Sequence, residues 1–140
     1  MEASELKCVM VIDESLPSGV IANTAAIIGI SLGKRFPEIV GCDVTDASGR
    51  VHPGIIEFPV PILKADKELI RSIREHLYEP GFSELAVVDF SDVAQGCRVY
   101  DEFIEKAAAI EESQLTYLGI GIYGRKKLVN KLTGFLPLLR

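Results

Sequence analysis

Residues 7–32 decide the fold, and they read KCVMVIDESLPSGVIANTAAIIGISL. Residues 8–12 form a continuous apolar run, which is typical of a strand buried on both faces of a sheet. Three polar residues, 13–15, end this strand, and Ser18 is placed to cap the helix that follows. Because residues 20–32 include only three polar side chains, we predict that this helix is buried nearly all round.

Length and composition favour one globular domain spanning residues 1–140, with 48% apolar and 25% charged residues. No apolar run is long enough to span a membrane, and the acidic N-terminus is unlike a signal peptide. The odd set of Cys8, Cys42 and Cys97 lacks the spacing of a zinc site or a disulfide framework. We therefore expect a cytoplasmic protein that needs no membrane, metal or cofactor.

The net charge of −5 is unevenly distributed. The last 20 residues contain five of the 15 basic residues and no acidic residue, whereas all 20 acidic residues lie before them. Phosphate repels an acidic surface, so only the C-terminal part is suited to contact nucleic acid. A tRNA partner is accordingly disfavoured.

The middle of the chain alternates extended and helical patterns. Two extended pieces, near residues 39–44 and 55–62, flank a turn at 46–49. Pro59 and Pro61 predict an edge strand, since proline cannot donate a hydrogen bond to a central ladder. Asp66 then begins an amphipathic helix that ends before Pro80.

The second half repeats this alternation. An apolar strand at residues 85–88 ends in Asp89, a polar loop follows, and a helix is predicted near 99–110. A glycine-rich strand at 115–122 precedes a last helix at about 125–132. The whole pattern predicts the α/β class, as a three-layer α/β/α sandwich around a mixed sheet.

Two acids, Asp13 and Asp89, follow predicted strands directly. If both face one crevice, repulsion raises the pKa of one of them and creates an acid/base pair. The alternative is that each caps a neighbouring turn. Asn23 and Thr24, at the start of the first helix, are either ligand contacts or internally bonded polar groups.

Two further features have both a functional and a structural interpretation. Residues 121–127 combine glycines with three basic residues, which suits either an anion site or close backbone packing. Cys97 lies beside Arg98, an arrangement that favours the thiolate, but no histidine is placed nearby to activate it.

The C-terminal pattern resembles a known family. Residues 118–121 (LGIG) and 128–136 (LVNKLTGFL) are similar to the closing signature of the archaeal/eukaryotic-type, or type 2, peptidyl-tRNA hydrolases. Residues 8–12 and 19–22 fall where that family has its first strand and helix, and the likeness extends to uncharacterised bacterial proteins of the same fold. The resemblance implies a peptidyl-tRNA hydrolase II-like, four-stranded mixed sheet, and a homodimer.

The departures from the family concern its active site. Val20, Thr24 and Ile27 stand where the resemblance places a lysine, a glutamine and a histidine. Valine carries no charge with which to polarise an ester. Asp89 matches the family's aspartate, and Ser91 is the nearest substitute for its threonine. The segments at 42–54 and 99–110 have no counterpart in the family.

Three hypotheses follow. The first is a divergent protein of this fold that binds a small ligand or an unidentified substrate in a polar pocket. The pocket residues, with Asp89 and Asp13 as the catalytic candidates, are Asp13, Ser15, Asn23, Thr24, Asp89, Ser91, Tyr123 and Arg125. The second is authentic peptidyl-tRNA hydrolysis, and the third is a non-catalytic dimeric binding module.

Overall fold

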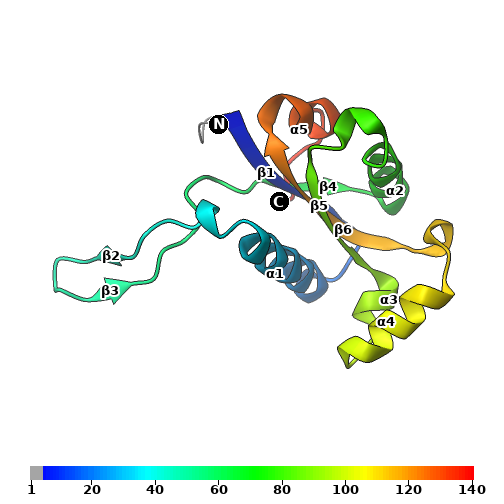
Figure 1. The fold of residues 1–140 in the computed structure, drawn as a ribbon, viewed down its shortest axis with the longest axis horizontal. Coiled ribbons are helices and arrows are strands. Elements are labelled where there is room, and N and C mark those ends of the chain that lie inside the picture. Colours follow the sequence, from blue (N-terminus) through cyan, green and yellow to red (C-terminus); the bar gives the residue numbers. More distant parts are fainter. Residues whose placement is uncertain (1–4) are drawn as a thin grey trace.

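The computed structural model describes residues 5–140, and its centre is a four-stranded mixed sheet (Figure 1). The strands are β1 (Leu6–Asp13), β4 (Ile62–Ala65), β5 (Ala86–Ser91) and β6 (Tyr117–Arg125), in the order β4-β1-β6-β5. β1 is parallel to β4, while β6 is antiparallel to both of its neighbours. The predicted α/β class and mixed sheet are confirmed.

Helices cover both faces of the sheet. The long helix α1 (Ser18–Arg35) packs on one face, and α2 (Lys67–His76) and α5 (Lys126–Thr133) pack on the other (Figure 1). Alternate side chains of β1 point to opposite faces, so Cys8 and Met10 join the α1 core whereas Val9 and Val11 join the α2–α5 core. The continuous apolar run of β1 is explained by this double burial.

The burial predicted for α1 is wrong. Only Thr24, Ile28 and Leu32 are buried along it, and Ile30 is 74% exposed. The helix lies against the sheet by one face, and no other element among residues 5–140 covers its apolar outer face. The predicted cap is also wrong, because Pro17 occupies the N-cap position and no side chain caps the helix.

Two strands run further than predicted. β5 continues to Ser91, so Asp89 lies inside the strand and not at its exit. β6 continues to Arg125 and is paired with β1 along nearly its whole length. Pairing with β1 keeps the glycines and the polar residues of β6 in the strand conformation. The length of β6 is therefore underestimated when it is judged from its local composition.

The strand β4 begins after Pro61 and lies at the sheet edge. The prediction of an edge strand containing Pro59 and Pro61 is wrong in its position, because both prolines precede β4. The preceding residues form a long arm that carries the two-residue strands β2 (Val44–Thr45) and β3 (Val51–His52) and extends away from the sheet (Figure 1). The turn predicted at residues 46–49 is confirmed by a hydrogen bond from the Gly49 N–H to the Asp46 carbonyl, and in the structure it joins β2 to β3.

The remaining elements connect these layers. The predicted helix α4 (Tyr100–Ala109) is present, and the short helix α3 (Asp92–Gln95) occupies part of the predicted loop. Single 3-10 turns, η2 to η4, occur at Pro37–Ile39, Pro80–Phe82 and Glu112–Gln114. No helix in the described part of the chain is both long and apolar enough to cross a membrane.

The Asp66 cap gives the first testable prediction. Its Oδ1 accepts a hydrogen bond of 2.8 Å from the backbone N–H of Leu69 at the start of α2. Asp66→Ala removes this acceptor, and we expect the free energy of unfolding to fall by about 1 kcal/mol in urea titrations. Ser18→Ala, at the helix start without a side-chain cap, is the matched control and is expected to leave stability unchanged. Equal losses of stability in the two variants would contradict the conclusion that Asp66 caps α2 whereas Ser18 does not cap α1.

Candidate functional site

The structure does not bring the eight predicted pocket residues together. Cys8 pairs with Tyr123 and Leu6 pairs with Arg125, so the C-terminal end of β6 lies beside the start of β1. Asp13 stands at the other end of β1. Tyr123 and Arg125 are therefore separated from Asp13 and Ser15 by the length of the sheet.

Several of these residues have local structural partners. Asp13 Oδ1 accepts hydrogen bonds from both the backbone N–H and the hydroxyl of Ser15, at 2.9 and 2.7 Å. The Thr24 hydroxyl donates to the Val20 carbonyl at 2.7 Å. Each bond is of the kind by which short polar side chains stabilise turns and helices.

Two more of the predicted residues, Ser91 and Asn23, are part of helix structure and are not directed into a shared pocket. The Ser91 hydroxyl accepts a bond of 3.3 Å from the N–H of Ala94 and caps α3. Asn23 lies on the exposed face of α1, whereas its neighbour Thr24 is buried beneath the helix. Asn23 and Thr24 thus point to different sides of α1.

Asp89 belongs to the edge strand β5 and is separated from β1 by β6. Its Oδ2 accepts a hydrogen bond of 2.9 Å from Arg74 Nε on α2, and the Arg74 guanidinium lies 4.1 Å from the centre of the Tyr78 ring. The partner of Asp89 is therefore an arginine and not a second carboxylate. The predicted Asp13–Asp89 pair does not form.

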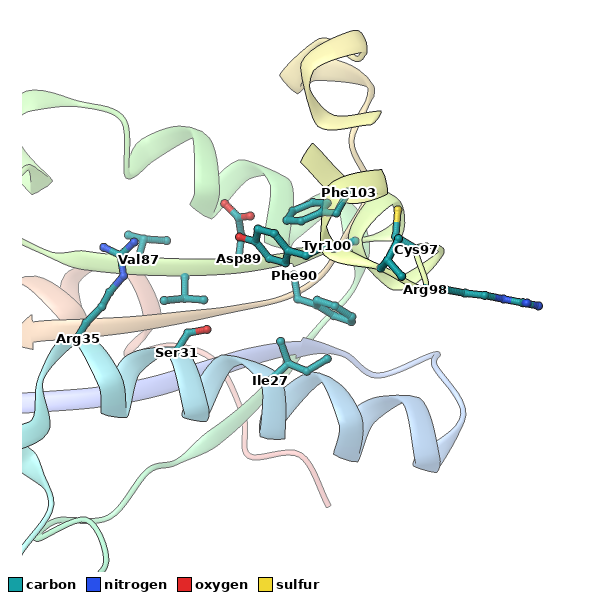
Figure 2. A pocket seen from close by; sticks show the side chains of 13 residues that line it. Ile27, Ser31, Arg35, Val87, Asp89, Phe90, Cys97, Arg98, Tyr100 and Phe103 are labelled. Carbon is teal, nitrogen blue, oxygen red and sulfur yellow. The ribbon is translucent and has the colours of Figure 1, made fainter. Parts of the chain in front are cut away.

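A cavity does exist at Asp89, along the edge of the sheet. We name it the β5 groove, and its volume is about 520 Å³. It is bounded by α1 (Ile27, Ser31 and Arg35), by residues 87–90 of β5, and by Ala94, Cys97, Arg98, Val99, Tyr100 and Phe103 around α3 and α4. Figure 2 shows that α1 lies on one side of the strand and that Asp89, Tyr100 and Phe103 lie on the other.

Aromatic rings line one end of the β5 groove. Tyr100 and Phe103 form an edge-to-face pair with ring centres 5.5 Å apart, and Phe90 projects toward Ile27 on α1 (Figure 2). The Tyr100 side chain is 72% exposed, so its ring is available to a ligand. Such rings supply a large contact area and a preference for planar or apolar groups.

Charge lies at the other end. Arg35, the last residue of α1, extends toward Val87 (Figure 2). Among residues 5–140 no carboxylate forms an ion pair with Arg35, whereas the Asp89 carboxylate is paired with Arg74. Among the described residues that line the groove, Arg35 supplies the free positive charge, because the Arg98 side chain points away from the cavity (Figure 2).

The geometry of Cys97 indicates a structural role for its thiol. Its Sγ donates to the Val93 carbonyl at 3.1 Å, as a thiol does when it stabilises a turn. In the described part of the chain, no cluster of three or more His, Cys, Asp or Glu residues has the geometry of a metal site. The Cys97 thiol is thus engaged in a local hydrogen bond at the groove.

The basic segment at the start of α5 forms a second hollow of about 610 Å³, which is lined by Glu5, Arg125, Lys126, Lys127 and Asn130. Arg125 Nε is paired with Glu84 at 2.7 Å, and Lys7 Nζ donates to Asn130 Oδ1 at 2.6 Å. Two of its polar groups are thus already satisfied within the protein.

Sequence reasoning missed Ser31, Arg35, Tyr100 and Phe103 as members of one site. Tyr100 and Phe103 were visible only as part of a helical apolar pattern, and Arg35 only as a residue near a helix end. Nothing local in the sequence indicates that α4 returns to the edge strand beside α1.

Comparisons with known proteins identify relatives whose function is unknown. A family model described as a protein of unknown function (DUF2000) matches residues 6–140. No curated protein matches. A solved structure of a protein of unknown function from Agrobacterium tumefaciens strain C58 has a TM-score of 0.86 and 16% identity, covering 96% of this chain and 97% of that chain. At this identity the likeness establishes a shared fold.

Proposed function

The chain belongs to the DUF2000 family of proteins of unknown function, and we propose that it is a binding protein whose ligand occupies the β5 groove. The ligand combines an apolar or aromatic body with an anionic group. The observation that carries the proposal is Arg35, which has no ion-pair partner among residues 5–140 and lies at one end of a cavity whose other end is aromatic. A cavity of about 520 Å³ with a few polar groups is typical in size and character of a small-ligand site.

Binding is favoured over catalysis by the contacts of the groove's carboxylate. Asp89 remains the acid/base candidate because it lines the groove, but its Oδ2 already accepts a hydrogen bond of 2.9 Å from Arg74 Nε. A general base needs a free path to the substrate proton. Arg74 occupies one of the two oxygens that Asp89 would use for this purpose.

We also propose that the fold is peptidyl-tRNA hydrolase II-like, on the strength of the C-terminal sequence pattern and the four-stranded mixed sheet. Hydrolysis of peptidyl-tRNA is the second candidate, favoured by the three basic residues around the start of α5. Hydrolysis by wild-type protein that is lost in Asp89→Ala would favour this second candidate over simple binding.

The proposed site is tested with phenylacetate as the probe and phenylacetamide as its uncharged counterpart. We expect phenylacetate to shift NMR signals of residues 87–90 and of α4, and to bind more tightly than the amide. Arg35→Ala should weaken phenylacetate binding about tenfold, equivalent to about 1.4 kcal/mol, and leave the amide unaffected. Lys34→Ala is the matched control, since Lys34 is exposed and does not line the groove. Equal affinity of the two probes, or signal shifts elsewhere, would contradict the proposal.

A further inference from the structure

The two edges of the sheet differ in whether another segment hydrogen-bonds to them. At the β4 edge the C-terminal segment lies alongside the strand, with Lys64 N–H donating to the Pro137 carbonyl at 3.0 Å and Leu139 N–H donating to Ile62 at 2.8 Å. This segment satisfies the backbone of β4 as a short antiparallel strand would. Proteins commonly cover an edge in this way, because a free edge is a template for further pairing.

Among residues 5–140, no segment covers the β5 edge in this way. In the described part of the chain, the backbone of residues 87–90 makes no main-chain hydrogen bond outside its ladder with β6. Successive residues of an edge strand direct their N–H and C=O groups alternately toward the neighbour and away from it. Half of these groups therefore face outward, and the same four residues line the β5 groove.

We propose that the β5 groove accepts an extended acidic peptide, which adds to β5 as a fifth strand with a carboxylate directed toward Arg35. The inference rests on the proposed function of the same groove and names the class of its ligand. Main-chain bonds to residues 87–90 hold the peptide, and the aromatic end and Arg35 select its side chains.

Charge and shape determine this choice of occupant. Arg35 has no carboxylate partner among residues 5–140, and the Asp89 charge is balanced by Arg74, so the groove favours an anionic segment. Val99, Tyr100 and Phe103 line the groove beside the strand. They stand in the way of a whole second sheet approaching β5, which disfavours edge-to-edge pairing of two copies.

The experiment uses capped six-residue peptides of alternating valine and threonine with an aspartate at either end. Their counterparts carry lysine instead, or N-methyl groups at every second amide. With an aspartate peptide, we expect hydrogen exchange of the outward-facing amides in residues 87–90 to slow at least tenfold. N-methylation should abolish this protection, because it removes the main-chain donors of the added strand.

Arg35 provides the specificity test. Arg35→Ala should remove the preference for aspartate over lysine peptides, and Arg35→Glu should reverse it, while Lys34→Ala retains it. The inference is overturned if neither aspartate peptide protects the β5 amides, or if the N-methylated peptides bind equally well. Concentration-dependent protection without peptide would overturn it in favour of a second copy.

The peptide result and the phenylacetate result separate the two proposals. If phenylacetate binds at the groove and no peptide protects β5, the groove is a small-molecule site and only the peptide inference fails. If neither probe reaches the groove, the proposed function fails as well.

Discussion

Replacing Gly121 by valine is expected to lower the free energy of unfolding by about 3 kcal/mol, near the upper end of the usual cost of overpacking. Gly121 lies in β6 directly beneath α1, and a Cβ atom built there would stand 2.3 Å from Ile28 Cγ2 and 3.0 Å from Leu32 Cδ1. Both side chains are almost completely buried, so neither can move without displacing the helix. The strand preference of valine offsets only a fraction of this cost.

Gly33→Ala is the control for the Gly121 prediction. No atom lies within 4 Å of a Cβ built at Gly33, and the residue is inside α1, where alanine is preferred over glycine by about 1 kcal/mol. Gly33→Ala is therefore expected to raise stability slightly in the same urea titrations. Wild-type stability in Gly121→Val would contradict the close seating of α1 on β6.

The elements that the sequence predicts correctly are those with a local chemical cause. The apolar run of β1 and the capping residue Asp66 each have a local chemical cause, and each indicates its element correctly. The burial of α1 has no such local cause. Its apolar composition is compatible with two covered faces, but the structure covers one, and Ile30 on the other is exposed.

The site was less predictable than the fold because it depends on pairing register and on chain crossings. Asp89 reads locally as the end of an apolar strand, but two further residues pair with β6 and place it within the ladder. Tyr123 and Arg125 read as neighbours of the same crevice, although the antiparallel direction of β6 takes them to the far end of the sheet. Direction and register arise from contacts between distant segments, which a local pattern does not contain.

The second large effect is expected at Arg71 on α2, which holds the loop before β6. Its guanidinium lies 3.2 Å from Glu112 Oε2 and donates to the backbone carbonyls of Glu112, at 3.0 Å, and of Leu115. It also lies 5.2 Å from the centre of the Tyr117 ring. Arg71→Ala removes the side-chain donor to the Leu115 carbonyl and the cation beside Glu112. We expect a loss of about 2 kcal/mol, since hydrogen bonds to charged groups are worth roughly 1.5–3 kcal/mol.

Lys67→Ala serves as the control for Arg71, because Lys67 lies on the same helix, is exposed and forms no ion pair with the described residues. It should change stability by less than about 0.5 kcal/mol. If Arg71→Ala is as mild as this control, the loop at residues 110–116 is held by its apolar contacts alone. The stability loss of Arg71→Lys should lie between those of Arg71→Ala and Lys67→Ala, since an ammonium group keeps the charge but lacks the forked donors of a guanidinium.

The pH dependence of the same cluster follows from Glu112. The Tyr117 hydroxyl donates to Glu112 Oε2 at 2.5 Å, and this bond, with the nearby Arg71 charge, holds the pKa of Glu112 below its ordinary value despite an opposing contribution from burial. Burial raises the pKa of Tyr117, so the hydroxyl remains a donor at neutral pH.

The lowered pKa of Glu112 in the folded protein predicts how stability depends on pH. The contribution of Glu112 to the free energy of unfolding is fully present above the unfolded pKa of about 4.3, and it is lost as pH falls through the folded pKa. The stability difference between wild type and Glu112→Gln should accordingly be constant from pH 6 to 7, by the same linkage, and shrink below about pH 4. A difference that persists unchanged into more acidic solution would show that the carboxylate charge does not hold the loop.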